Sequence, residues 1–233
     1  MMQFQLTRKQ MTNLLYSLKG EGQEPSAILA GFEAYQSDNN QIPHFLLKRN
    51  KKWSNQENGL STNEIVSLAN LCELTSLTSS SLQNWIKRDV KDLIGAPELG
   101  KKYSIEQVAM LLIVKDLKTV FDFEKIRQLL SVVFNTLSDR SDDFMSPLAF
   151  YEIYATVLDS LDESSSLSLN DRQLENHIIS KVHLYNRQFP DLSQEQWEPI
   201  KNVLVITILA VLATHLQLRT QLYLNTNSHL IFP

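Results

Sequence analysis

The feature that most constrains this chain is an uncharged stretch near its C-terminus. No residue between Lys201 and Arg219 is charged, and Val203–Leu218 is mostly Val, Ile, Leu and Ala. Such a helix is apolar on every side and must be covered all round. The run is shorter than the roughly 20 apolar residues of a spanning helix, and it contains polar residues such as Thr207 and His215. We therefore expect a buried central helix rather than a membrane anchor, and no membrane partner.

Turn-forming residues are too few for a β-sandwich or barrel. The 233 residues include 6 Gly and 7 Pro, whereas short strands need frequent punctuation and long helices need little. No segment of useful length alternates apolar and polar residues with period two. With 43% hydrophobic residues and a formal charge of -4, the chain is also unlike a disordered one. The composition therefore favours an all-α globular protein.

Serine-led motifs mark four helix starts. Capping boxes begin at Ser61, Ser104 and Ser193, where the serine and the Glu or Gln three residues later bond each other's backbone amides. Ser146 precedes a proline suited to the first helical position. Together with apolar spacing, these signals predict helices at residues 6–19, 25–36, 62–74, 79–92, 104–118, 122–137, 147–161, 171–187 and 194–223.

Charge is divided unevenly along the chain. The formal charge is -1 over residues 1–43, +3 over 44–130 (13 cationic against 10 anionic residues) and -6 over 131–233. A basic segment within an acidic protein suits a nucleic-acid-binding module joined to a partner or sensor domain. The expected division is an N-terminal helical extension and linker at 1–58, a middle domain at 59–137 and a C-terminal helical domain at 138–233.

The middle region has the pattern of a helix-turn-helix. A helix bearing Ile65 and Leu68 is followed by a polar turn with one apolar residue, Leu77, and then by a second helix over 79–92. This order of apolar anchor, turn and second helix is typical of the motif. Cys72 is expected at the small, buried position where the two helices cross.

Residues 65–130 as a whole resemble a known DNA-binding head. The helix-turn-helix is followed by a glycine-containing turn with Lys101, Lys102 and Tyr103, and then by a helix pair. This segment resembles the N-terminal domain of MerR-type regulators, and is more closely similar to a family of uncharacterised proteins of low-GC Gram-positive bacteria with a MerR-like head. The resemblance implies a MerR-like winged helix-turn-helix domain plus a helical C-terminal domain, binding to double-stranded DNA, and a homodimer.

The resemblance also places candidate contacts. The opening of the MerR-type second helix matches residues 81–85, where Gln83 replaces an arginine, and the basic residue and tyrosine of the wing match Lys101 and Tyr103. Gln and Asn can pair with adenine, while serines and lysines can bond phosphate. Trp85 is expected in the core rather than stacked on a base. The candidate DNA-binding residues are Ser79, Ser80, Ser81, Gln83, Asn84, Lys87, Arg88, Lys91, Lys101, Lys102 and Tyr103.

Catalytic and metal-binding patterns are missing from the sequence. None of the five histidines is spaced three or four residues from another, so a helical metal pair is not expected. A phosphate-cradling glycine loop and a nucleophile elbow are also absent. We expect no enzyme activity, no cofactor and no metal. The lone Cys72 cannot form an internal disulfide, which makes the cytoplasm the default compartment.

The sequence thus predicts a homodimeric DNA-binding transcriptional regulator. Its C-terminal half could hold a small-molecule effector of unknown identity. The alternative is a non-enzymatic helical interaction or scaffold protein whose winged helix no longer binds DNA. The Lys48–Lys52 run suits either a phosphate contact or a solvated linker.

Overall fold

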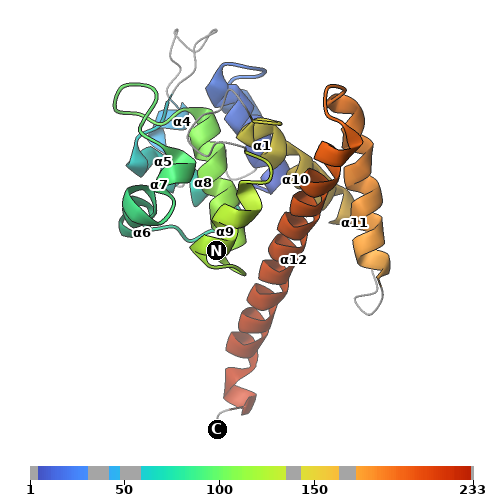
Figure 1. Ribbon diagram of the computed structural model, residues 1–233. Helices are drawn as coiled ribbons and strands as arrows, with labels where there is room; N and C mark the ends of the chain where they lie inside the picture. Colours follow the sequence, from blue (N-terminus) through green and yellow to red (C-terminus); the bar gives the residue numbers. More distant parts are fainter. Residues whose placement is uncertain (1–4, 31–41, 48–58, 135–142, 163–171, 232–233) are drawn as a thin grey trace.

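The structure is a computed structural model that describes residues 5–30, 42–47, 59–134, 143–162 and 172–231. The described part contains helices and isolated β-bridges but no strand, which confirms the all-α prediction. Figure 1 shows the helices gathered into a body from which one long helix projects. In chain order they are α1 (Arg8–Lys19), α2 (Pro25–Ala30), α4 (His44–Leu47), α5 (Thr62–Ala69), α6 (Ser79–Asn84), the π-helical turn η2 (Trp85–Asp89), α7 (Lys91–Ile94), α8 (Ile105–Lys118), α9 (Phe123–Leu130), α10 (Pro147–Asp162), α11 (Gln173–His183), the 3-10 turn η3 (Leu184–Gln188) and α12 (Gln194–Ile231).

All four serine-led start signals form caps. Ser61 and Ser104 each complete a capping box, with Glu64 and Gln107 respectively. Before α12, the backbone amide of Ser193 donates to the side chain of Gln196, whose amide donates back to the serine hydroxyl. The Ser146 hydroxyl accepts from the Ala149 amide at 3.2 Å. Local sequence therefore fixes where these helices begin.

Helix ends differ more from the prediction. The helix expected over 62–74 ends at Ala69, because the side chain of Asn70 accepts from the Leu77 amide and donates to its carbonyl, which stabilises a turn instead. The helix expected over 79–92 is divided into α6, η2 and α7. The helix expected over 25–36 is described only as far as Ala30. The helix expected over 122–137 ends earlier, at Leu130, and a turn follows it. Helix α12 continues to Ile231, eight residues beyond its expected end at 223.

One continuous apolar core joins the three predicted segments. Helix α8 is buried almost along its whole length, and α10 packs against α1, α8, α11 and α12. Buried side chains from Leu6 to Val211 belong to the same core. The expected boundaries at 58/59 and 137/138 stay predictions, and the described part packs across both of them.

An ion-pair cluster lies inside this body. The guanidinium of Arg8 on α1 donates to both carboxylate oxygens of Asp116 on α8, at 2.7 and 2.9 Å, and the Tyr154 hydroxyl of α10 donates to Asp116 at 3.0 Å. Burial alone would raise the pKa of the Asp116 carboxyl, but the charges of Arg8 and Lys115 hold it well below its usual range. The cluster therefore ties three helices together through a charged carboxylate.

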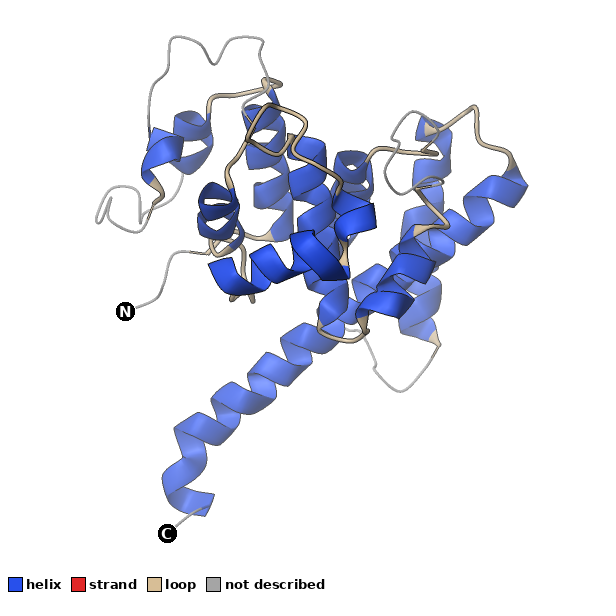
Figure 2. Cartoon of the chain, turned by 60° about the vertical axis from the view of Figure 1, so that its left-hand side comes forward, coloured by secondary structure: helices blue, strands red, loops and turns tan. Residues whose placement is uncertain are grey.

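Helix α12 is half embedded and half projecting. Its first half is covered by α8, α10 and α11. Residues from Leu212 to Arg219 line a cavity together with α1 and α10, and the last turns extend away from the body, as Figure 2 shows from a second side. By length and composition alone, Gln194–Ser228 is long and apolar enough to cross a membrane. The stretch predicted to be buried, Val203–Leu218, is mostly buried up to Val211, whereas Ala213, Leu216 and Gln217 are exposed.

Candidate nucleic-acid interface

The turn between α5 and α6 is built from side-chain hydrogen bonds. Besides the two bonds of Asn70 to Leu77, the Thr78 hydroxyl accepts from the Ser81 amide at 3.2 Å and so caps α6. Leu77 is buried, and Leu74 has a φ of 59°, which an ordinary side chain rarely adopts. These bonds hold α6 at a fixed angle to α5.

Helix α6 presents a polar outer face. Leu82 is fully buried, while Ser80, Gln83 and Asn84 are exposed. Ser79 and Ser81 are half-buried, and both take part in the hydrogen bonds at the start of the helix, Ser79 with Asn63 and Ser81 with Thr78. The amide side chains at the end of the helix are therefore the ones free to reach a ligand.

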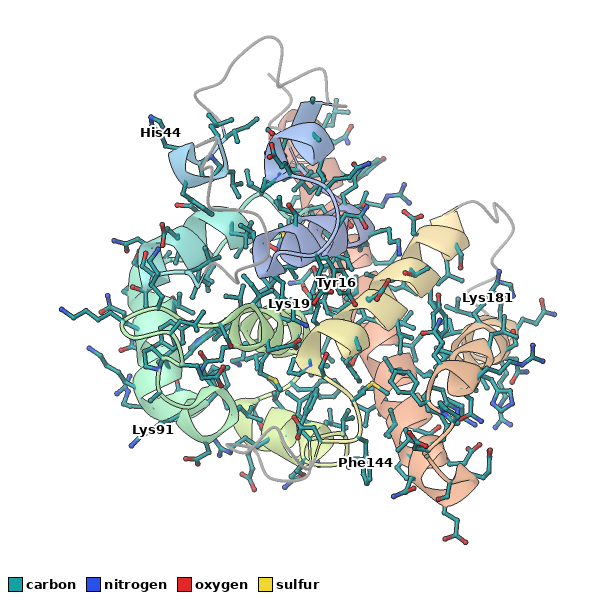
Figure 3. The ribbon with its side chains drawn as sticks, turned by 90° about the horizontal axis from the view of Figure 1, so that it is seen from above. Tyr16, Lys19, His44, Lys91, Phe144 and Lys181 are labelled. Atoms are coloured by element: carbon teal, nitrogen blue, oxygen red, sulfur yellow. The ribbon has the colours of Figure 1, made fainter. Side chains whose placement is uncertain are left out.

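Cationic side chains continue this face beyond α6. Lys87 and Arg88 of η2 and Lys91 of α7 are exposed, and Figure 3 shows Lys91 pointing away from the body. Within the described residues none of the three forms an ion pair. The same segment also carries Asp89 and Asp92, so its positive charge is partly balanced.

The inner side of η2 is fixed by α9. The rings of Trp85 and Phe123 meet edge-on with centroids 5.7 Å apart, and Arg127 donates from Nη1 to the Asp89 carbonyl at 2.6 Å. Trp85 is thus half-buried and packed against the core, rather than fully inside it as expected. The contacts hold the cationic segment against the body.

The turn after α7 places three further candidate residues. Leu99 and Lys102 exchange backbone hydrogen bonds of 3.0 and 3.1 Å around Gly100, whose φ is 70°, and Tyr103 pairs with Leu60. Lys101 and Lys102 are exposed, and the ammonium of Lys102 lies 3.3 Å from a Glu64 carboxylate oxygen. The Tyr103 side chain is 7% exposed, so it supports the turn from below.

Two residues that the sequence reasoning did not select hold this turn in place. The Gln107 side chain donates to the carbonyls of Ile94 and Ala96 at 2.7 Å and accepts from the Ser104 amide at 3.0 Å. At Gly59, an added Cβ would lie 2.9 Å from the side chains of Leu99 and Lys102. A buried glutamine in a capping box and a glycine just before a helix were visible signals, but their partners become clear only in the fold.

The structure thus gathers most of the candidate residues onto one segment. Those on α6, η2 and α7 follow one another along the outside of the body. Lys101 and Lys102 lie on the turn that follows, and Tyr103 lies beneath that turn.

Cys72 is buried, as expected, but its position differs from the prediction. It follows α5, and its sulfur lies 3.9 Å from the Tyr151 hydroxyl of α10, so it is not at the crossing of α5 and α6. No group of three or more His, Cys, Asp or Glu side chains suited to a metal occurs among the described residues.

Comparisons with known proteins found one matching family and one curated bacterial relative. Residues 39–154 match the family described as Domain of unknown function (DUF1836), and this range includes α4 to α9 and half of α10. The chain is 50% identical over 219 residues to the Uncharacterized protein YkrK of Bacillus subtilis (strain 168), and the match covers 92% of this chain and 94% of that protein. No solved structure matches it significantly.

Proposed function

The chain belongs to the DUF1836 family, and we propose that within this family it acts as a homodimeric DNA-binding regulator with a MerR-like winged helix-turn-helix head. The proposed head comprises α5 to α9, and the proposed wing is the turn around Gly100. Its second helix is α6. The division into head and C-terminal helical domain remains part of the proposal.

The observation that carries this proposal is the outer surface of α6, η2 and the following turn. Gln83 and Asn84 are exposed at the end of a helix whose opposite side is anchored by Leu82, and cations follow at Lys87 and Arg88. Exposed amides can pair with the edge of adenine in the major groove, whereas lysine and arginine neutralise phosphates. The surface therefore combines a reading element with a backbone-binding element.

The partly balanced charge of this surface limits the number of phosphate contacts. Lys102 is paired with Glu64, and Asp89 and Asp92 lie among the other cations. Each neutralised phosphate contributes about -0.9 to the slope of log affinity on log salt. We therefore expect a negative slope whose magnitude corresponds to only a few phosphate contacts for each head. Binding should then depend on two heads acting together.

A second copy of the chain is the proposed partner of the projecting half of α12. Leu216, Tyr223 and Leu230 recur every seven residues along this part of the helix. All three are exposed, and a seven-residue repeat keeps one stripe facing a partner helix in a coiled coil. Pairing of two such helices would present two heads to a two-fold symmetric DNA site.

A salt titration of binding to a mixed-sequence duplex tests DNA binding. We expect affinity to fall steadily from 50 to 200 mM salt, and Lys87→Glu to weaken binding and reduce the magnitude of the slope by about 1. The matched control is Lys181→Glu on α11, which Figure 3 places on the other side of the body from Lys91. That variant should bind as the parent does.

The scaffold alternative predicts a different result. Absence of binding at 50 mM salt, or equal binding by both lysine variants, would contradict the proposed DNA surface. A dimer that forms without any DNA binding would instead favour a helical interaction protein. Cytoplasmic localisation and absence of enzyme activity also stay predictions.

A further inference from the structure

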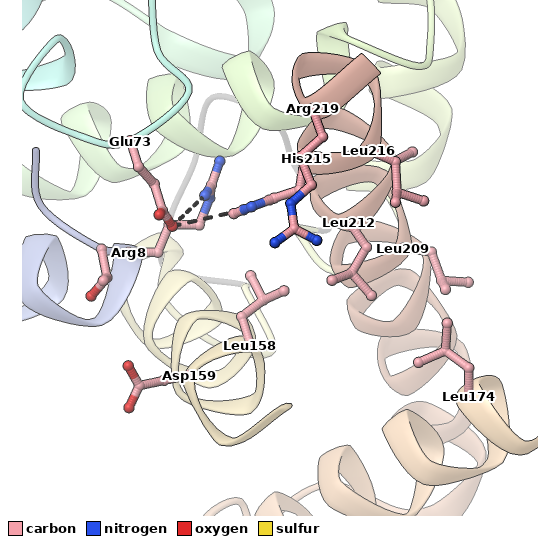
Figure 4. Close-up of a pocket in the computed structure, with 12 residues that line it drawn as sticks. Arg8, Glu73, Leu158, Asp159, Leu174, Leu209, Leu212, His215, Leu216 and Arg219 are labelled. Carbon is pink, nitrogen blue, oxygen red and sulfur yellow. Dashed lines mark hydrogen bonds and ion pairs between the residues drawn. The ribbon is translucent and has the colours of Figure 1, made fainter. Parts of the chain in front are cut away.

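A cavity of about 520 Å³ lies where α12 passes the body. Its walls come from α1, the segment after α5, α10, α11 and α12 (Figure 4). None of the eleven candidate DNA-binding residues lines it. A volume of this size falls in the range of small-molecule sites. The cavity is therefore a separate feature from the proposed DNA surface.

Most of the cavity wall on α10, α11 and α12 is hydrocarbon. Five leucines from these three helices line the cavity. They are Leu158, Leu174, Leu209, Leu212 and Leu216. Water in contact with such a wall gains few hydrogen bonds, so an apolar body is the favoured occupant of this part.

The opposite wall carries charge, and most of that charge is already balanced. Arg8 is buried and bonds Asp116 twice and Glu73 once, at 3.1 Å, while Lys115 lies 3.2 Å from Asp116. Two cations thus face two carboxylates. His215 on α12 lies 3.8 Å from the same Glu73 oxygen. This group has no net charge to offer a ligand while His215 is neutral.

Arg219 adds a positive charge to that wall. Its side chain lines the cavity one turn beyond His215, and Figure 4 shows its guanidinium directed into the space beside Leu158. Asp159 also lines the cavity, but in Figure 4 its carboxylate points away from Arg219, beyond Leu158. A guanidinium at the edge of an apolar wall matches a planar carboxylate joined to a hydrocarbon chain.

We propose that this cavity binds a small amphipathic carboxylate, with its hydrocarbon chain on the leucine wall and its carboxylate on Arg219. Arg219 lies on α12, whereas Arg8 and Glu73 come from α1 and the segment after α5. An occupied cavity therefore connects the long helix to the body at the point where that helix begins to project. The proposal does not depend on DNA binding.

Isothermal titration calorimetry of the full chain with decanoate, in the absence of DNA, tests the site. We expect saturable binding of one decanoate per chain and no saturable binding of decylamine, which has the same hydrocarbon chain and the opposite charge. Arg219→Gln should weaken decanoate binding at least about tenfold, since it removes a charge-assisted contact. Arg219 is exposed, so the variant should remain folded.

Two further variants separate the cavity from nonspecific binding. Ala213→Trp places a large side chain at an exposed position of the cavity wall and should abolish binding by filling the space. Arg187→Gln makes the same exchange as Arg219→Gln at an exposed position of η3 away from the cavity, and should bind as the parent does. Equal binding by the Arg219 and Arg187 variants, binding of decylamine as strong as that of decanoate, or no saturable decanoate binding would overturn the proposal.

Discussion

The two halves of α12 have similar apolar side chains and opposite surroundings. In the first half, Trp197, Leu204 and Ile208 are fully buried, whereas in the second half Leu222 is 56% and Tyr223 70% exposed. The first half lies among α8, α10 and α11, and the second half extends past them. Burial of an apolar helix therefore depends on which neighbours reach it, and hydrophobicity alone does not decide it.

This difference gives each half a distinct expected role. Loss of packing in the embedded half should destabilise the monomer, because the removed atoms leave a cavity in a close-packed core. Changes in the projecting half should leave the monomer intact and alter association, because large exposed apolar patches mark interaction sites. Matched substitutions in the two regions can test this division.

The largest difference in the free energy of unfolding is expected between variants of two arginines. Arg8→Met in the body leaves the buried Asp116 without its main cation and should lower the free energy of unfolding by about 3–5 kcal/mol. Arg219→Met on the projecting half should change it by less than about 0.5 kcal/mol. Urea unfolding followed by circular dichroism measures both, and equal losses would show that the two regions are not energetically distinct.

Two leucines give the next largest difference. Leu204→Ala removes a fully buried side chain and should cost about 2–5 kcal/mol, whereas Leu222→Ala should stay within about 0.5 kcal/mol. The exchange is chemically identical, so only the surroundings differ. Measurements at low protein concentration keep association from contributing to either value. A large loss for Leu222→Ala under those conditions would mean that the monomer covers this part of α12.

Self-association should depend on the projecting half of α12 and not on its embedded half. Tyr223→Glu places a charge within the seven-residue repeat and should weaken self-association at least about tenfold, because a charge in an apolar interface lacks a partner. Sedimentation equilibrium measures the effect. Gln221→Glu adds the same charge next to the stripe and serves as the control. If both variants remain dimeric, the stripe is not the interface.

Acid should destabilise the body by a smaller amount. The folded pKa of Asp116 is lowered, and a carboxyl of this kind titrates near 3.9 when unfolded. Its contribution to stability is therefore complete above that value and is lost as the pH falls toward the folded pKa. By pH 3 the expected loss is about 1 kcal/mol. Urea unfolding at pH 5 and pH 3 checks this, and Asp116→Asn should show a smaller difference between the two pH values than the parent.

Helix starts could be predicted from the sequence because they depend on neighbours in the chain. A serine and the Glu or Gln three residues later satisfy each other's backbone amides wherever the rest of the protein lies, as at Ser61 and Ser104. The exposed polar residues of the candidate interface were also visible, since Gln83 and Asn84 follow the buried Leu82 at helical spacing.

Other parts of the candidate interface needed contacts between distant residues. Asn70 ends α5 by bonding Leu77 across the turn, and Gln107 holds the turn that displays Lys101. The place of Tyr103 beneath that turn follows from its backbone pairing with Leu60. Such bonds join residues of separate segments, so no local sequence pattern predicts them.

Local sequence is enough to show that this protein is helical, where most of its helices begin, and that one uncharged helix must be covered by other parts of the protein. Those properties follow from local hydrogen bonding and from the periodicity of apolar residues. The fold as a whole is needed to show that α10 and α8 cover the first half of α12 while its end projects, and that Arg8 bonds Asp116 inside the body. Long-range packing sets these features, because it depends on how segments far apart in the chain share one core.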